Sequence, residues 1–489
     1  MKKEIILMLI LILSVNNFLF AQTAPDTLWT KNFGGASGDQ AVAIQQTSDG
    51  GYIILGSTES YGNGQLDTWL VKIDENGDEI WNNTYGGTAN DFALSIQQTS
   101  DMGYIFTGLT ESYGNGGPDF WLVKTDSIGN ELWSKTYGGA DHDRAQYVIQ
   151  TSDGGFAITG GTYSFSNGED DVWLIKTDDN GNEIWNRTYG GPGKEKAYSV
   201  HETLDGGYIL SGFTDPDRNL TFDVYLIKTD ENGNEIWSRT FGGTDRENAY
   251  TCELTNDGGY ILAGYTKSFG NGQEDIYLIK TDTNGNEMWN KTYGGSGVDI
   301  SYSAKQTTDG GYIIAGFTNS IGNGGFDIWF IKTDENGDVE WDQTIGGSLD
   351  DLSFFVQQTS DGGYISAGST YSFGNGDQDF YIIKLDSDKS TFVSQTRFIP
   401  TETSLYANYP NPFNAETTFT FEIGKPANIT LQIYNVSGQV VHTVVNYLYF
   451  NKGYHSKKIN AGSLASGIYF YKLTSNFGFT QIKKMCVLK

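Results

Sequence analysis

The feature that most constrains this chain of 489 residues is a 52-residue unit that recurs seven times without an insertion or deletion. A tryptophan marks each copy, and an aspartate opens a glycine-containing turn at the same spacing. The tryptophans are Trp29, Trp81, Trp133, Trp185, Trp237, Trp289 and Trp341, and the aspartates are Asp49, Asp101, Asp153, Asp205, Asp257, Asp309 and Asp361. A period of this length is typical of repeat architectures in which each unit packs on its neighbours.

Each unit predicts four short strands. In residues 39–87, the turn Asp49-Gly50-Gly51 joins a mixed segment, 41–47, to an apolar run, 52–56. A longer loop leads to 69–73, and Asn76-Gly77, a strong hairpin signal, turns the chain into 80–85. The 63 glycines also favour short strands and tight turns over helices. We therefore predict an all-β fold: a seven-bladed β-propeller of four-stranded antiparallel blades over residues 22–386.

The phase of the repeat predicts how the ring closes. The last copy lacks its tryptophan strand, whereas a spare one, residues 27–33, precedes the first copy. We expect 27–33 to pair with the strand near 380–385 and to complete blade seven. A ring closed in this way has no unpaired blade edge.

The motif within one repeat points to a family. It reads Trp81-x-x-Thr84-Tyr85-Gly86-Gly87, then Asp91, Asp101-x-Gly103-Tyr104 and Gly108-x-Thr110. Over about residues 29–386 this motif resembles the SBBP-type β-propeller repeats of secreted bacterial proteins, and the resemblance implies a fold, since most members have no defined activity. Kelch propellers are disfavoured because their double glycine follows a hydrophobic strand, whereas Gly50-Gly51 precedes one.

The N-terminus has the features of a secretory signal peptide. Lys2 and Lys3 precede an apolar run, 5–15, and Ala21 precedes Gln22, which predicts a signal peptide over residues 1–21. The apolar run is too short to span a bilayer, and no other stretch approaches about 20 apolar residues, so no membrane span is expected. Cys252 stands at the register position of Ile44, which indicates a small buried hydrophobe.

A different composition follows residue 386. Residues 387–403 are predicted to be a linker, and the alternation of Ile429, Leu431 and Ile433 predicts a small Ig-like β-sandwich over residues 404–489. Four motifs stand out: Tyr409-Pro410-Asn411-Pro412-Phe413-Asn414, Gly438-Gln439-Val440-Val441, Leu464-Ala465-Ser466-Gly467-Ile468-Tyr469 and Lys483-Lys484-Met485.

These motifs closely resemble the type A C-terminal sorting domain of the type IX secretion system, with Ala415 and Cys486 as departures. The resemblance implies that residues 404–489 engage the type IX secretion machinery and that the protein crosses the outer membrane of a Bacteroidetes-like bacterium. The protein is then expected in the extracellular space or on the outer-membrane surface. An ordinary Ig-like module that binds sugar or protein is the alternative.

The sequence assigns no catalytic residue and no metal ligand. The four histidines occupy unrelated positions, which suggests neither a catalytic triad nor a zinc site. Asp74-x-Asn76-Gly77-Asp78 has its glycine too early for an EF-hand loop, so a hairpin turn is the better interpretation. No cofactor is predicted; calcium is possible but is not favoured. The formal charge of −29 argues against nucleic acid as a partner.

The candidate ligand-binding residues lie on the face where the loops after the second and fourth strands emerge, which we call the loop face. One acid precedes each innermost strand. These seven acids are Asp39, Asp91, Asp143, Glu195, Glu247, Asp299 and Asp351, and Tyr61, Tyr113, Asp217 and Arg218 complete the candidate set. Seven acids could hold cations or sugar hydroxyls, but because every blade repeats them, capping of loop backbone groups is favoured.

Tyr61 and Tyr113 could stack on sugar rings or fasten the loops. Asp217 and Arg218 belong to the one loop that departs from the repeat.

These observations favour a secreted, non-enzymatic propeller that presents a multivalent binding face to a glycan or protein ligand, since repeated weak contacts gain avidity. The alternative is a polysaccharide-active hydrolase that uses loop-face carboxylates. It would need two carboxyl groups about 5 to 10 Å apart in unlike environments.

Overall fold

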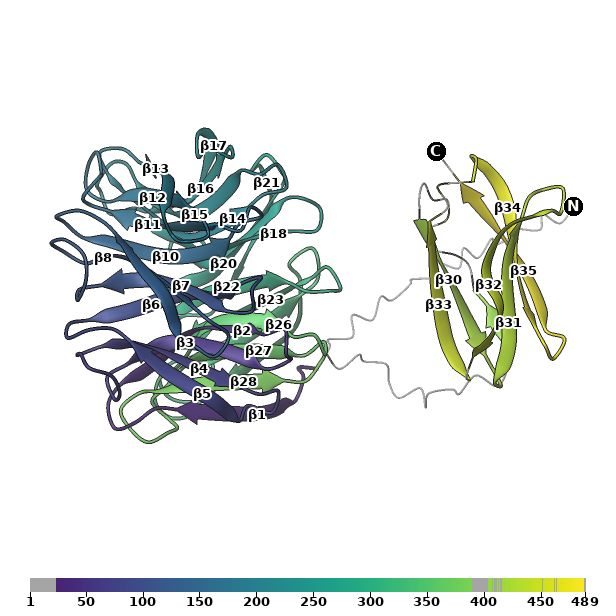
Figure 1. The fold of residues 1–489 in the computed structure, drawn as a ribbon, viewed down its shortest axis with the longest axis horizontal. Coiled ribbons are helices and arrows are strands. Elements are labelled where there is room, and N and C mark those ends of the chain that lie inside the picture. Colours follow the sequence, from purple (N-terminus) through teal and green to yellow (C-terminus); the bar gives the residue numbers. More distant parts are fainter. Residues whose placement is uncertain are drawn as a thin grey trace, which may run out of the picture. The chain divides into compact units, whose positions relative to one another are not determined.

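The computed structural model describes residues 23–388, 403–406, 408, 411, 413, 416–450, 452–460, 462 and 464–487. The chain divides into two compact units, 1–390 and 391–489. The first contains seven four-stranded antiparallel sheets, and the second contains one sheet of three strands and one of four (Figure 1). The predicted all-β fold class is confirmed. The expected signal peptide and most of the expected linker lie outside the described residues.

The first four blades have the same strand order, from the innermost strand outward. Blade one comprises β2 (Asp39–Gln46), β3 (Tyr52–Thr58), β4 (Asp67–Ile73) and β5 (Glu79–Tyr85); blade two, β6 (Asp91–Gln98), β7 (Tyr104–Thr110), β8 (Asp119–Thr125) and β9 (Glu131–Tyr137). Blade three comprises β10 (Asp143–Gln150), β11 (Phe156–Thr162), β12 (Asp171–Thr177) and β13 (Glu183–Tyr189); blade four, β14 (Lys194–Glu202), β15 (Tyr208–Asp215), β16 (Asp223–Thr229) and β17 (Glu235–Phe241).

The last three blades include the one that closes the ring. Blade five comprises β18 (Glu247–Leu254), β19 (Tyr260–Thr266), β20 (Asp275–Thr281) and β21 (Glu287–Tyr293); blade six, β22 (Asp299–Gln306), β23 (Tyr312–Thr318), β24 (Asp327–Thr333) and β25 (Val339–Ile345). Blade seven comprises β26 (Asp351–Gln358), β27 (Tyr364–Thr370), β28 (Asp379–Leu385) and β1 (Thr27–Phe33). β1 pairs antiparallel with β28, with Lys31 opposite Ile382, which is the pairing expected from the phase of the repeat.

The repeated tryptophans join neighbouring blades. Each lies on the outermost strand and packs against an aromatic residue on the second strand of the next blade, as Trp81 does against Tyr104 with ring centroids 6.0 Å apart. Trp29 on β1 packs in the same way against Tyr52 of blade one, at 6.2 Å. The tryptophan period therefore marks the packing between blades, and β1 contributes both backbone pairing and this contact.

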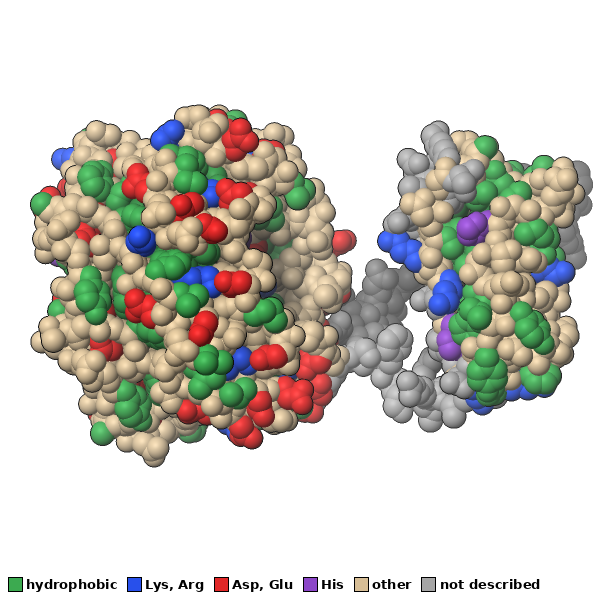
Figure 2. All heavy atoms as spheres, viewed as in Figure 1, with side chains coloured by type: hydrophobic (Ala, Val, Ile, Leu, Met, Phe, Trp, Pro, Cys, Tyr) green, Lys and Arg blue, Asp and Glu red, His purple; other side chains and the backbone are tan. Residues whose placement is uncertain are grey.

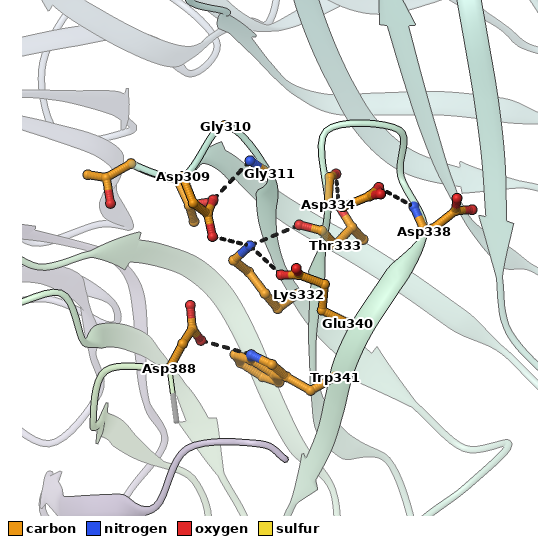
Figure 3. A network of polar contacts seen from close by, with 12 residues as sticks. Asp309, Gly310, Gly311, Lys332, Thr333, Asp334, Asp338, Glu340, Trp341 and Asp388 are labelled. Atoms are coloured by element: carbon orange, nitrogen blue, oxygen red, sulfur yellow. Dashed lines mark hydrogen bonds and ion pairs between the residues drawn. The ribbon is translucent and has the colours of Figure 1, made fainter. Parts of the chain in front are cut away.

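An ion pair between a buried lysine and a half-exposed aspartate stabilises the Asp-Gly turn of every blade. In blade six, the Nζ of Lys332, which is fully buried, lies 2.9 Å from Asp309 Oδ2 and donates to the Thr333 carbonyl oxygen at 2.9 Å (Figure 3). The same Asp carboxylate accepts the Gly311 amide. Corresponding Lys–Asp pairs occur in the other six blades. The Asp-Gly turns therefore have a structural role.

The second unit is a two-sheet sandwich, as predicted. One sheet comprises β29 (Ser404–Leu405), β30 (Glu416–Ile423) and β33 (Gly453–Asn460); the other comprises β31 (Ala427–Tyr434), β32 (Val440–Phe450), β34 (Gly467–Ser475) and β35 (Thr480–Val487). Side chains from both sheets form one core that includes Phe419, Ile429, Leu431, Ile433 and Tyr471. The three alternating residues that predicted the strand β31 are all fully buried.

Candidate functional site: the loop face and the central channel

The seven acids at the start of the innermost strands are buried and hold the loops. Asp39 is fully buried, and its Oδ2 accepts the Gly35 amide and the Ser60 hydroxyl, both at 2.7 Å. The acids at Asp91, Asp143, Glu195, Glu247, Asp299 and Asp351 accept the corresponding glycine amides at 2.7 to 3.1 Å. Their geometry agrees with capping of loop backbone groups, the interpretation favoured from the sequence.

The loop aromatics rest on the blades. The rings of Tyr61 and Tyr113 are about half exposed, and they pack on Trp69 and Trp121 with centroids 5.1 and 6.1 Å apart. Each Tyr hydroxyl donates to a backbone carbonyl oxygen in the loop that enters the blade. These contacts fasten the loops while one side of each ring remains exposed on the loop face.

The loop of blade four departs from the repeat in structure as it does in sequence. Arg218 has a φ of 55°, in the left-handed region, and its Nε donates to the carbonyl oxygen of Pro192. Asp217 is exposed beside it. This loop therefore contacts the segment that precedes β14, and the Arg218 hydrogen bond holds the two segments together. The side chain of Asp217 is exposed to solvent.

The innermost strands β2, β6, β10, β14, β18, β22 and β26 surround a central channel. Near its loop-face end, all seven strands line a cavity of about 260 Å³. On one side of this cavity, four aromatic side chains occupy one register position on the innermost strands of blades four to seven: Tyr198, Tyr250, Tyr302 and Phe354. Their successive centroids lie 5.0, 4.3 and 5.2 Å apart, and the rings of Tyr250 and Tyr302 are stacked. We call these four residues the aromatic crescent.

The other blades place smaller or more flexible side chains at the same register position. These are Val42, Leu94 and Gln146. The cavity is thus aromatic on one side and aliphatic or amide on the other, although the blades that surround it have nearly the same sequence.

A second cavity of about 440 Å³ continues the channel toward the Asp-Gly turns. Here Glu253 Oε1 accepts an ion-paired hydrogen bond from Lys305 Nζ and lies 3.5 Å from His201 Nε2. Burial raises the pKa of Glu253, but Lys305 and His201 outweigh that effect and hold it below its ordinary value. Burial lowers the pKa of His201, although the charge of Glu253 opposes this shift. The side chains of Glu253, Lys305 and His201 thus meet on one side of the channel.

An aspartate with a strongly altered pKa lies at the loop end of blade three. Burial raises the pKa of Asp170 to about 7, although the nearby charges of Lys196 and Arg144 oppose the shift. Arg144 and Lys196 belong to the innermost strands β10 and β14, at one register position. Asp170 is therefore the acid in this region that exchanges a proton near neutral pH, which is a feature of many functional sites.

These groups are far apart in the sequence, where the four histidines look isolated. However, His201, Glu253 and Lys305 follow one another at the 52-residue spacing, as do Tyr198, Tyr250 and Tyr302. Departures from the repeat within the innermost strands were the available signal. In the described ranges no group of three or more His, Cys, Asp or Glu side chains could hold a metal ion.

The chain of this protein carries a large excess of acid, and Figure 2 shows acidic side chains spread over the propeller face that it draws. In the part of the chain that the structure describes, no helix is long and apolar enough to cross a membrane.

Solved structures with similar architecture have low sequence identity to this chain. A puromycin hydrolase is 10% identical with a TM-score of 0.46, over 79% of this chain and 59% of that one. The polysaccharide lyase Uly1 is 14% identical with a TM-score of 0.43, over 73% and 92%. A protein of unknown function from Dyadobacter fermentans is 9% identical with a TM-score of 0.41, over 74% and 99%.

No curated protein matches the chain. The family model of the secretion system C-terminal sorting domain matches residues 407–488. The tail unit is therefore a type IX sorting domain, and it marks the protein for export to the cell surface or the extracellular space.

Proposed function

We propose that the exported propeller is a non-enzymatic binding protein that takes a glycan or an extended protein segment into the loop-face end of its central channel. One observation carries this proposal. The positions that build the blades repeat, whereas the positions that face the channel differ from blade to blade. A structural repeat does not require that asymmetry, but recognition of one ligand in one orientation does.

The chemistry of the cavity suits such a ligand. Binding sites are commonly apolar and aromatic, with a few polar groups that fix orientation. The aromatic crescent supplies flat apolar surface, and Gln40 and Gln146 supply amide groups in the same cavity. Tyr61 and Tyr113 are about half exposed on the loop face and do not line this cavity. The resemblance to SBBP-type repeats of secreted proteins is consistent with a role outside the cell.

A glycan array and a peptide array, probed with the purified propeller, test this proposal. Tyr250→Ala is expected to weaken binding at least about tenfold, because the crescent loses its central ring. Tyr113→Ala is the matched control, since it removes a tyrosine from the loop face and leaves the channel intact. If Tyr113→Ala abolishes binding and Tyr250→Ala does not, the ligand is held at the rim and the channel proposal is wrong.

Asp170 favours a second candidate function, the polysaccharide-active hydrolase. A carboxyl group with a pKa of about 7 can act as a general acid at neutral pH. The seven capping acids offer little support, because they are buried and bonded to the loops. Release of reducing sugar from a panel of polysaccharides, lost in Asp170→Asn, would favour the enzyme; an inactive wild-type protein that still binds glycans would exclude it for that panel.

A further inference from the structure

A pocket of about 240 Å³ lies in the outer part of the junction between blades two and three. Blade two contributes Tyr137, the last residue of β9, and blade three contributes Glu183 and Asn186 of β13. Trp173 of β12 and Phe165, from the loop between β11 and β12, also line it. We call it the wedge pocket, and it shares no lining residue with either channel cavity.

Aromatic rings provide flat apolar surface in the wedge pocket. Phe165 packs on Trp173 with ring centroids 5.0 Å apart, and Phe165 is 49% exposed whereas Trp173 is buried. The Tyr137 hydroxyl donates to the Gly181 carbonyl oxygen at 2.6 Å, which holds the tyrosine ring in place. Rings that are already fixed lose little conformational freedom when a ligand packs on them. The apolar part of the pocket is therefore formed before any ligand binds.

A chain of hydrogen bonds orients the polar groups of the wedge pocket. Trp173 Nε1 donates to Asn186 Oδ1 at 3.3 Å, and Asn186 Nδ2 donates to Glu183 Oε1 at 2.6 Å. Asn186 and Glu183 are exposed, so a ligand can reach both. The amide nitrogen keeps a second hydrogen, and the carboxylate has a second oxygen. An oriented donor and an oriented acceptor thus lie side by side in a pocket with aromatic walls.

These groups suit a ligand that carries neighbouring hydroxyl groups. A hydroxyl both donates and accepts hydrogen bonds, so two adjacent sugar hydroxyls can pair with the Glu183 carboxylate and the Asn186 amide hydrogen. The apolar face of a pyranose ring can pack on an aromatic side chain. An ammonium group fits less well, because it only donates and cannot pair with an amide hydrogen. The charge of Glu183 repels an anionic sugar, so the lining favours a neutral one.

The same chain of hydrogen bonds recurs in blade one and is broken in blade two. In blade one, Trp69 Nε1 donates to Asn82 Oδ1 at 3.1 Å, and Asn82 Nδ2 donates to Glu79 Oε1 at 2.6 Å. Blade two has Ser134 in place of the asparagine. There the indole nitrogen of Trp121 is buried and, among residues 23–388, has no hydrogen-bond partner. Blade two therefore lacks the amide that orients the carboxylate.

We propose that the wedge pocket of blade three and the equivalent position of blade one each bind a neutral pyranose sugar. The sugar ring would pack on Phe165, or on Tyr61 in blade one, and adjacent hydroxyl groups would bond to the oriented carboxylate and amide. These sites are separate from the channel site of the proposed function. A single sugar unit makes few contacts, so a millimolar Kd is expected, and a glycan that reaches both positions gains avidity.

Nuclear magnetic resonance of the tryptophan indole N–H groups tests this proposal on the purified protein. The signals of Trp69 and Trp173, assigned with Trp69→Phe and Trp173→Phe, report on the two sites alone, because neither residue lines a channel cavity. Glucose, galactose, mannose and N-acetylglucosamine are titrated separately to about 50 mM. We expect at least one sugar to shift both signals saturably. Unmoved signals with all four sugars overturn the proposal, as does a shift with tetramethylammonium alone, which would reveal a cation site.

A pair of variants separates a specific site from general charge. Glu183→Gln keeps the size of the side chain and removes the charged acceptor, so the Kd read from the Trp173 signal is expected to rise at least about fivefold. The Trp69 signal should titrate as in the wild type, which also shows that the variant is folded. Glu131→Gln is the matched control, because Glu131 has the same repeat position in blade two. Equal Kd values at Trp173 in the two variants would contradict the proposal.

Discussion

At the scale of single residues, the repeated Asp-Gly turn depends on a buried lysine. Lys176 is 5% exposed, and its Nζ lies 2.9 Å from Asp153 Oδ2. Burial raises the pKa of Asp153, but hydrogen bonds from Thr151, Lys176 and Gly155 outweigh it and hold the pKa at about 2. The same balance lowers the pKa of Asp205 and Asp257 to about 2. A depressed folded pKa means that the stability contributed by these carboxylates is present above the unfolded value of 3.8 and is lost as pH falls through about 2.

The melting temperature is therefore expected to fall steeply between about pH 4 and pH 2. Circular dichroism melts over this range measure the effect. Asp153→Asn should lower the melting temperature by a few degrees at pH 7 and reduce the loss on acidification, because one pair no longer titrates. Asp179→Asn, at an exposed hairpin position, serves as the control. A melting temperature that is flat across this range would contradict the role of the pairs.

Asp170 affects the pH dependence of stability in the opposite direction. Its folded pKa of about 7 lies above the ordinary value of 3.8, so ionisation of the buried carboxyl destabilises the fold as pH rises through this interval. Asp170→Asn imitates the protonated form at every pH. The variant should gain stability over the wild type as pH increases from 5 to 8, measured as the difference in melting temperature. A constant difference across that range would show that Asp170 ionises normally.

At the scale of secondary-structure elements, the closing strand is the critical one. β1 provides the fourth strand of blade seven, and Trp29 packs on Tyr52 of blade one, so a single strand links the two ends of the ring. Without β1, the polar backbone groups of β28 would be unpaired along one edge.

Deletion of residues 22–35 is expected to lower the melting temperature of the propeller by at least about 10 °C, because it removes both the backbone pairing and the tryptophan contact. Differential scanning calorimetry measures this loss. Removal of residues 404–489 is the control, since they belong to the other compact unit and should leave the propeller transition in place. A propeller that melts normally without β1 would show that closure contributes little.

At the scale of the whole molecule, a nearly sevenfold scaffold carries an asymmetric channel and a separate export tail. Because the tail forms its own two-sheet core, it contributes no blade. Cells that produce a chain without residues 404–489 are expected to retain folded propeller in the periplasm, because the sorting domain is lost. Fractionation followed by immunoblotting measures its location. Normal amounts of the truncated protein on the cell surface would contradict this expectation.

Much of this architecture was predictable because the relevant patterns are local and are repeated. The Asn76-Gly77 turn, the alternation at Ile429 and Leu431, and the spare strand at residues 27–33 each specify an element from a few neighbouring residues. Seven repetitions then fix the number of blades. The capping of loops by Asp39 and its counterparts was also predictable, because a short acid beside glycine-rich turns commonly bonds to backbone amides.

The sequence by itself thus determined the blades, their number, the strand that closes the ring and the tail that directs export. The tertiary structure alone decided which side chains meet when seven blades close around one axis. His201, Glu253 and Lys305 meet in the channel only because adjacent blades bring them together. Burial and pairing depend on these contacts between blades, and the local pattern of one repeat does not contain them.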